Sequence, residues 1–417
     1  MRKSLLFVYL ILSVISYMVG YANNLSASPD PKGRVVWELL RAQDYEGPIQ
    51  RGTVDAEGRI AYLATRGKLY QIQTQDGRPV VRPIAEKPKK GPDQDIMKKA
   101  FLALAPGGGV YAWMIPHPFG RGLFFVRLFD LSGNQIGELN LKDFPYGFGS
   151  LYLGFQGKII VTTSPLEDWQ GIRGRFQFTF WGKDGTILNK ERVILDGRHM
   201  ATLDPAGESI LFLGDNRAKA YNAFGVKLWE HQGSFRKGAI AQKGYLALLN
   251  PSSPEKIKQL VIVKKKLLEP PEVSPTTKPV IFPSAVHGLT LTPDGSSAAV
   301  IGDEGYYSYL DTSAGELKEV KKPLVPEKES SFYIFNSKFV NANSLALGIQ
   351  RRVGKPPKDT WKDCKIIIVD REGNTLFEKE YPLREAISSI PGIDVTFDNH
   401  FVVGFTQDTV VLVELRN

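Results

Sequence analysis

The sequence repeats one short unit eight times, and this limits the chain to folds that are assembled from equal parts. In the unit at residues 289–320, an apolar run precedes Pro293-Asp294-Gly295, and three further short runs follow, separated by two more small turns. Proline presets φ and glycine adopts left-handed φ, so each break is a tight turn between extended segments. The unit therefore predicts four antiparallel strands. A sheet of about 30 residues cannot bury its own faces in water and must pack against others.

The first turn of every unit is marked by a glycine or an asparagine. These residues recur at intervals of 37 to 56 residues, most of them close to 50. The marked positions are Gly58, Gly108, Gly157, Gly207, Gly244, Gly295, Asn343 and Asn399. Four strands per unit at this spacing are typical of a β-propeller. We therefore predict an all-β propeller of eight four-stranded blades. Seven blades remain an alternative, because the fifth unit has lost its last turn signature.

The eighth unit ends at residue 417 after its third strand, so one strand is missing there. GRVVWELL at residues 33–40 resembles GVKLWEH at residues 225–231, the fourth strand of the fourth unit. We predict that residues 33–40 complete the last blade. This pairing would close the ring and remove an exposed sheet edge. Residues 33–417 would then form one propeller domain.

The N-terminus has the features of an export signal. Arg2 and Lys3 precede an apolar run, and Gly20-Tyr21-Ala22 offers small residues for cleavage. We predict a signal peptide at residues 1–22 and a linker at residues 23–32. An uncleaved inner-membrane anchor is the alternative, although the run is short for a span of about 20 residues. No cysteine follows the run, which argues against a lipid-anchored lipoprotein. Cys364 is the only cysteine, so it cannot form an intramolecular disulfide. A signal of this type on a disulfide-free mature chain suits a bacterial periplasm, and a periplasmic or secreted location is expected.

The chain is basic, with a formal net charge of +9. Removal of residues 1–22 takes away Arg2 and Lys3 and no acidic residue, which leaves +7. This excess favours an acidic partner, either an envelope protein or an anionic surface of polysaccharide or lipid headgroups. Export argues against nucleic acid. A basic surface that serves only solubility is the alternative.

The long loops all fall on one side of the predicted ring. In a blade, the loop between the second and third strands emerges on the same face as the connectors between blades, and the first and third turns emerge on the other face. The second loops are long at residues 115–122, 164–175, 250–259 and 351–365. An aromatic side chain among arginines is typical of a recognition patch. The candidate binding residues are Arg121, Trp169, Arg173, Arg351, Arg352 and Trp361. The alternative is that these loops are solvated connectors without a partner.

The sequence contains no motif of a known catalytic or metal site. The five histidines show no H-x-H or H-E-x-x-H spacing, and there is no nucleophile elbow, phosphate loop or calcium loop. We predict no catalytic residue, no metal and no cofactor. Converging Asp, His or Arg side chains in the central channel would favour an enzyme. The innermost strands LTLT, LALA, ATLD and AIAQ are mostly apolar and small, which favours a scaffold.

The units resemble known bacterial propeller repeats. LTPDGSSAAVIGDEG and LDPAGESILFLGDN resemble TolB-like and WD40-like repeats, and GVKLWE and GRVVWE resemble pyrroloquinoline-quinone-like repeats. The resemblance implies a fold more strongly than a function. The nearest functional analogue is the periplasmic scaffold of the BamB type, although this chain lacks its lipidated cysteine. Quinoprotein dehydrogenases carry a vicinal cysteine pair and acidic calcium ligands, which this chain lacks.

The sequence therefore predicts an exported, non-catalytic protein-binding scaffold of the cell envelope that acts through its long-loop face. One alternative is a propeller enzyme, a hydrolase, lyase or quinoprotein-like dehydrogenase, with its site at the central channel. Another is a carbohydrate-binding propeller, which is favoured if the aromatic residues at 113, 169, 181 and 361 share one surface.

Overall fold

The computed structural model describes most of the chain after residue 32. Described are residues 33–416 except 42, 56, 59, 66, 77, 87–99, 117–122, 141–149, 167–172, 197–200, 215, 242–243, 245, 252–256, 259–260, 265–271, 276–279, 282–285, 303–304, 313–315, 322–329, 354–359, 383–391 and 397–400. By its internal contacts, the stretch from Gly33 to Arg416 is one compact unit. The predicted signal peptide and linker lie outside the described residues.

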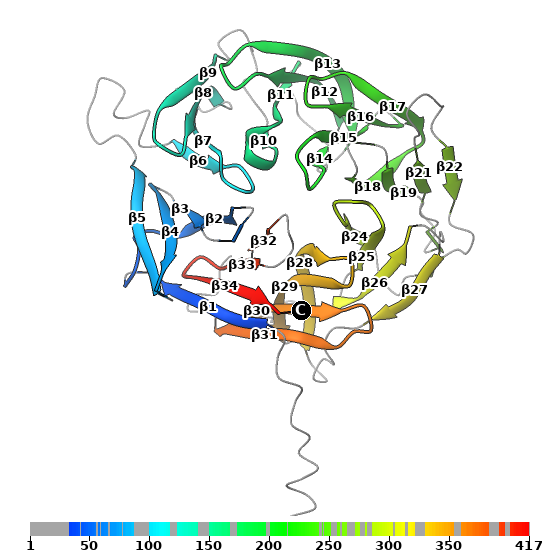
Figure 1. The fold of residues 1–417 in the computed structure, drawn as a ribbon. Helices are drawn as coiled ribbons and strands as arrows, with labels where there is room; N and C mark the ends of the chain where they lie inside the picture. The colour runs from blue at the N-terminus through cyan, green and yellow to red at the C-terminus, as the bar shows by residue number, and fades with distance from the viewer. Residues whose placement is uncertain are drawn as a thin grey trace, which may run out of the picture. The chain divides into compact units, whose positions relative to one another are not determined.

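Eight four-stranded antiparallel sheets form a ring around a central channel (Figure 1). The predicted eight-bladed propeller is therefore confirmed. In blades 1 to 7, the strands follow one another from the channel outward in chain order.

Blades 1 to 4 are built as follows: β2 (Ile49–Val54), β3 (Ile60–Thr65), β4 (Lys68–Gln75) and β5 (Arg78–Glu86); β6 (Phe101–Leu104), β7 (Val110–Pro116), β8 (Leu123–Asp130) and β9 (Gln135–Asn140); β10 (Ser150–Leu153), β11 (Ile160–Pro165), β12 (Arg173–Trp181) and β13 (Ile187–Asp196); β14 (Ala201–Leu203), β15 (Ser209–Gly214), β16 (Arg217–Asn222) and β17 (Lys227–Gln232).

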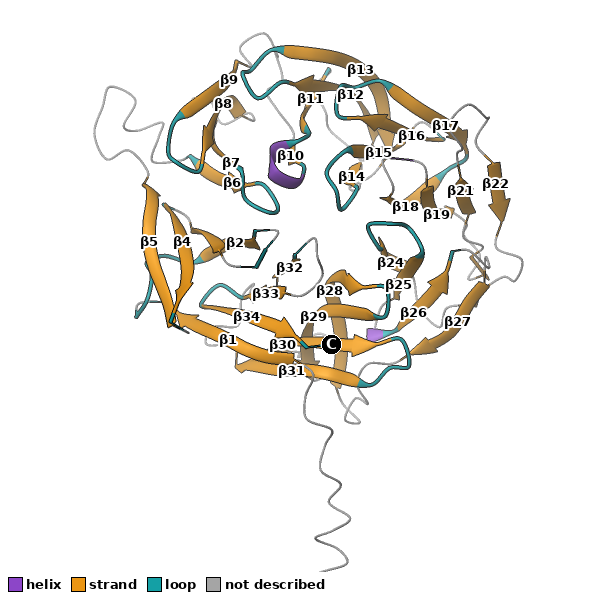
Figure 2. Ribbon diagram, in the orientation of Figure 1, coloured by secondary structure: helices purple, strands orange, loops and turns teal. Residues whose placement is uncertain are grey.

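Blades 5 to 8 are built as follows: β18 (Phe235–Ala241), β19 (Leu246–Pro251), β21 (Val261–Lys264) and β22 (Glu272–Pro275); β24 (Val286–Leu291), β25 (Ser297–Gly302), β26 (Tyr307–Asp311) and β27 (Glu316–Lys321); β28 (Ser330–Asn341), β29 (Ser344–Val353), β30 (Thr360–Asp370) and β31 (Thr375–Pro382); β32 (Gly392–Val395), β33 (Phe401–Phe405), β34 (Thr409–Leu415) and β1 (Gly33–Leu40). A 3-10 turn, η1 (Phe155–Gly157), follows β10 (Figure 2).

One small extra sheet links two of the long segments. Strand β20 (Ile257–Lys258) lies in the second loop of blade 5, and β23 (Val280–Ile281) lies in the connector from blade 5 to blade 6. The two strands pair antiparallel, with Lys258 opposite Val280. This pairing agrees with the expectation that second loops and blade connectors emerge on the same face.

The first-turn glycines have the backbone conformation that the repeat pattern predicts. Gly58, Gly108, Gly157, Gly207, Gly244 and Gly295 all have φ between 65° and 82°. This left-handed region is costly for a side chain with a Cβ atom. Asn343 departs from the pattern, because β28 and β29 are joined by a shorter turn in which Asn341 pairs with Ser344. Asn399 lies outside the described residues.

Each sheet buries its faces against its two neighbours. Eight apolar clusters occur among the described residues, one at each contact between consecutive blades. Between blades 3 and 4, for example, the rings of Phe178 and Phe212 lie 3.8 Å apart between centroids. Because each four-stranded sheet is flanked on both faces, stability in this ring comes from interfaces between blades.

Strand β1 closes the ring as predicted. It pairs antiparallel with β34 from Gly33 opposite Leu415 to Leu40 opposite Thr409. Trp37 of β1 is 4% exposed, packs into the cluster between blades 8 and 1, and donates its Nε1 hydrogen to Thr74 Oγ1 at 3.1 Å. Trp229 occupies the same place in β17 of blade 4 and packs toward blade 5. The similarity of the two W-E segments therefore reflects a shared position in the blade.

We expect Trp37→Ala to destabilise the ring strongly, because the change removes a buried indole and one hydrogen bond at the closing blade. Truncation of a buried tryptophan costs about 3–5 kcal/mol. Urea unfolding of the full chain, followed by circular dichroism, measures the effect. Val35→Ala on the same strand is the control, since Val35 is 37% exposed. We call the junction of β1 with β34 and blade 1 the seam of the ring. Equal urea midpoints for the two variants would contradict the role of Trp37 at the seam.

Candidate functional site

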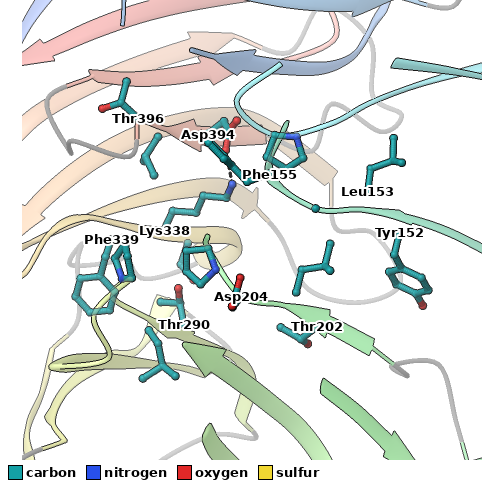
Figure 3. Close-up of a pocket in the computed structure, with 18 of the residues that line it drawn as sticks. Tyr152, Leu153, Phe155, Thr202, Asp204, Thr290, Lys338, Phe339, Asp394 and Thr396 are labelled. Atoms are coloured by element: carbon teal, nitrogen blue, oxygen red, sulfur yellow. Dashed lines mark hydrogen bonds and ion pairs between the residues drawn. The ribbon is translucent and has the colours of Figure 1, made fainter. Parts of the chain in front are cut away.

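A cavity of about 380 Å3 lies in the central channel (Figure 3). Seven of the eight blades contribute to its wall. Many lining residues, such as Pro106, Phe155, Pro205 and Pro293, belong to first turns. The cavity therefore lies toward the first-turn face, opposite the face where the long loops emerge.

A buried ion pair beside this cavity joins four consecutive blades. Asp394 of β32 forms an ion pair with Lys338 of β28 (Figure 3). Thr53 Oγ1 of β2 donates a hydrogen bond to the same carboxylate. Thr53 Oγ1 in turn accepts a hydrogen bond from the Gly107 N–H of blade 2 at 2.7 Å. The Asp394 side chain is 5% exposed, whereas that of Lys338 is 37% exposed. Asp394 therefore holds blades 7, 8, 1 and 2 together at the channel.

The second buried acid in the cavity, Asp204, caps a turn. It is 3% exposed and accepts hydrogen bonds from Ser209 Oγ at 2.5 Å and from the Glu208 N–H at 2.8 Å. Burial raises its pKa above the ordinary value, and the hydrogen bonds oppose that rise. The same turn position in other blades also accepts a backbone N–H, through Asp55, Thr292 and Thr396. Asp204 therefore occupies a turn-capping position that recurs in blades 1, 6 and 8.

The wall of the cavity carries two basic side chains, Arg51 and Lys338, and two acidic ones, Asp204 and Asp394. The innermost strands hold Arg51, Arg236, Lys237 and Lys338, and Asp394 is the sole acidic residue in those eight strands. LTLT, LALA, ATLD and AIAQ do not include these charged strand residues, which lie elsewhere in β2, β18, β28 and β32. The sequence signal was a basic residue directly before a glycine, as in Arg51-Gly52 and Lys237-Gly238.

A β-bulge accompanies these basic residues. The register shifts between Ile49 and Arg51 in β2 and between Phe235 and Lys237 in β18. Bulges re-aim side chains and are common beside functional sites. Gly52 is required for close packing, because a Cβ atom there would lie 2.9 Å from the ring of Phe405 in blade 8. The bulge and the glycine together set where Arg51 lies.

The six candidate binding residues are described only in part. Arg121 and Trp169 lie outside the described residues, and for Arg173, Arg352 and Trp361 only the backbone is described. Arg352 and Trp361 are direct cross-strand partners in β29 and β30. Arg351 pairs with the buried Asp363, which accepts from its Nε at 2.8 Å and its Nη2 at 2.5 Å. The binding role of these residues stays a prediction.

Two of the four aromatic residues considered for carbohydrate binding are core residues. Trp113 and Trp181 are each 4% exposed and belong to different clusters, between blades 1 and 2 and between blades 2 and 3. They do not share a surface. Trp169 and the side chain of Trp361 lie outside the described residues. A shared surface of these aromatic residues would have favoured a carbohydrate-binding propeller, and Trp113 and Trp181 do not form one.

Among the described residues, no three His, Cys, Asp or Glu side chains are placed to hold a metal ion. None of these residues forms a helix that is long and apolar enough to cross a bilayer. Cys364 is 1% exposed, and burial raises the pKa of its thiol to about 12, with Asp363 adding to the rise. The thiolate is the nucleophilic form of cysteine, so this thiol is inert in the folded protein.

We expect Thr53→Val to destabilise the protein by about 1–3 kcal/mol, because it leaves both the Asp394 carboxylate and the Gly107 N–H without their hydroxyl partner. Valine has nearly the shape of threonine, so packing is kept. Urea unfolding measures the change. Thr53→Ser retains the hydroxyl and is the control; a serine variant as unstable as the valine variant would argue against the hydrogen-bond network.

We also expect Cys364 to resist iodoacetamide at about pH 8 in the folded chain and to react once the chain is unfolded in urea. Mass spectrometry of the alkylated protein measures the fraction modified. Rapid alkylation without denaturant would contradict the buried position of Cys364.

Comparison with known proteins supports the fold. No family of proteins matches the sequence, and no curated protein matches it either. Among solved structures, the chain is similar to the C-terminal WD40 domain of Sif2, with a TM-score of 0.56 and 10% identity over 92% of this chain and 99% of that one. A structure of KlHsv2, in which loop 6CD is replaced by a Gly-Ser linker, has a TM-score of 0.46 and 11% identity, over 81% of this chain and 98% of that one. The protein is an eight-bladed β-propeller of WD40-like architecture.

Proposed function

We propose that this chain is an exported, non-catalytic scaffold of the cell envelope that binds a protein partner through its long-loop face. The proposal of a non-catalytic role depends on one observation, that both carboxylates of the central cavity are already bound by neighbouring groups of the protein. Asp394 is engaged by Lys338 and Thr53, and Asp204 caps a turn. A general acid or base must be able to reach a substrate proton. Asp394 is instead committed to contacts that hold the ring, and Asp204 to contacts that hold its turn.

The sequence pattern supports the choice of face. The second loops and connectors are long and rich in lysine and proline, whereas the first and third turns are short. Loops on a rigid scaffold commonly carry recognition. The fold of the WD40 domain of Sif2 is a further support, since propellers of this kind commonly serve as interaction scaffolds. The excess positive charge favours an acidic envelope protein; anionic polysaccharide or lipid headgroups are the alternatives.

Arg351 has a structural role as well as a proposed binding role. Its guanidinium neutralises Asp363, whose side chain is 5% exposed and whose Oδ1 has no hydrogen-bond partner among the described residues. Loss of the arginine would leave a buried carboxylate unpaired, which is destabilising. An experiment on binding should therefore keep Arg351 and change the other candidates.

We expect a variant with Arg121, Trp169, Arg173, Arg352 and Trp361 changed to alanine to lose its envelope partner. The full chain and the variant are expressed in a bacterial host, crosslinked in the intact envelope and purified, and the captured proteins are identified by mass spectrometry. The control changes Lys158, Lys183 and Phe224, exposed residues of the first-turn and third-turn face, to alanine. A partner kept by the control and lost by the variant supports the proposal. Equal capture by all three proteins would contradict the long-loop face.

A further inference from the structure

Arg51 is the basic side chain of the cavity wall that takes part in no ion pair among the described residues. It lines the cavity from β2 and is half-buried. Lys338, the other cation of the cavity, is already paired with Asp394. Arg51 forms no ion pair and no hydrogen bond with any described side chain. A guanidinium remains charged at any ordinary pH, so it is available to a bound anion.

The charges around Arg51 favour an anion with one negative charge. Lys338 is neutralised by Asp394, so Arg51 is the cation of the wall that remains to attract an anion. Asp204 and Asp394 lie in the same wall and would repel a second negative charge on the ligand.

The remaining wall of the cavity is mostly apolar with a few hydroxyl groups. Leu151 and Leu289 line the cavity. Phe339 adds further carbon surface, while Thr202 and Thr290 supply hydroxyls (Figure 3). A cavity of about 380 Å3 is within the size range of small-molecule sites. Pockets of this composition bind a ligand by burying an apolar body and fixing its orientation through a few polar groups.

We propose that the central cavity binds a small amphipathic monocarboxylate, with the carboxylate on Arg51 and the apolar body against Leu151, Leu289 and Phe339. Arginine holds a carboxylate with two parallel N–H···O hydrogen bonds, which fixes the head group. The site lies toward the first-turn face and is independent of the loops that are proposed to bind a protein. A negative result for carboxylate binding would leave the proposed scaffold function unaffected.

The test is calorimetric titration of the full chain with hexanoate, phenylacetate and cinnamate, and with hexanol and cinnamyl alcohol as uncharged analogues. We expect saturable binding of at least one carboxylate, weaker binding of its alcohol, and an affinity that falls as salt is added. Arg51→Gln should weaken the binding of that carboxylate at least about tenfold, because glutamine lacks the charge and the two parallel N–H donors of the guanidinium. Arg82→Gln is the matched control, since Arg82 is an exposed arginine of β5 in the same blade.

Several outcomes would overturn the proposal. They are the absence of binding by all three carboxylates up to millimolar concentration, equal affinities in the wild-type and Arg51→Gln proteins, and equal affinities for a carboxylate and its alcohol. Tighter binding of phenyl phosphate than of phenylacetate would overturn the carboxylate class. Arg51-dependent binding of a poly-glutamate peptide without binding of the small carboxylates would point to an acidic chain in the channel. Thermal melting of each variant in the absence of ligand verifies that it is folded.

Discussion

The pairing of β1 with β34 is the contact on which the rest of the ring depends. Arg34 and Glu414, which form an ion pair across it, are 380 residues apart in the chain. A propeller blade has no stable place of its own until both neighbours are present, so this distant pairing must form before blades 1 and 8 can be buried on both faces. Without β1, the outer edge of blade 8 would expose unpaired N–H and C=O groups, which are a template for aggregation.

The same seam is held at the channel by charge. Asp394 lies in blade 8 and joins Lys338 of blade 7, Thr53 of blade 1 and, through Thr53, the backbone of blade 2. The sole acidic residue of the innermost strands therefore lies where the chain ends must meet. Strand β1 secures the rim of the seam and Asp394 secures its centre. A buried carboxylate is costly unless it is paired and hydrogen-bonded, and here both conditions are met.

The fold could be predicted from the sequence because the four-strand unit repeats. The residues of the cavity could not be predicted, because they do not repeat from blade to blade. Six turn glycines recur at nearly equal spacing, and each has the left-handed φ that this spacing implied. Arg51, Lys338 and Asp394 come from three different blades and have no counterpart at the same place in most others. These residues become neighbours only when the ring is closed, and their spacing in the sequence does not reveal this. The segments LTLT, LALA, ATLD and AIAQ contain none of these three residues, which lie in β2, β28 and β32.

The two ends of the channel are suited to different tasks. Long loops can vary in sequence without disturbing the blades, whereas Thr53, Asp204 and Asp394 at the first-turn end also hold a turn or a contact between blades. Arg51 and Thr53 are two residues apart on β2, so their side chains lie on the same face of that strand. A carboxylate bound to Arg51 would therefore be held by the strand that also receives the Asp394 network. Any ligand that binds only the closed ring stabilises it in proportion to the logarithm of ligand concentration. Occupancy of the cavity would thus strengthen the seam while the long-loop face stays free for a partner.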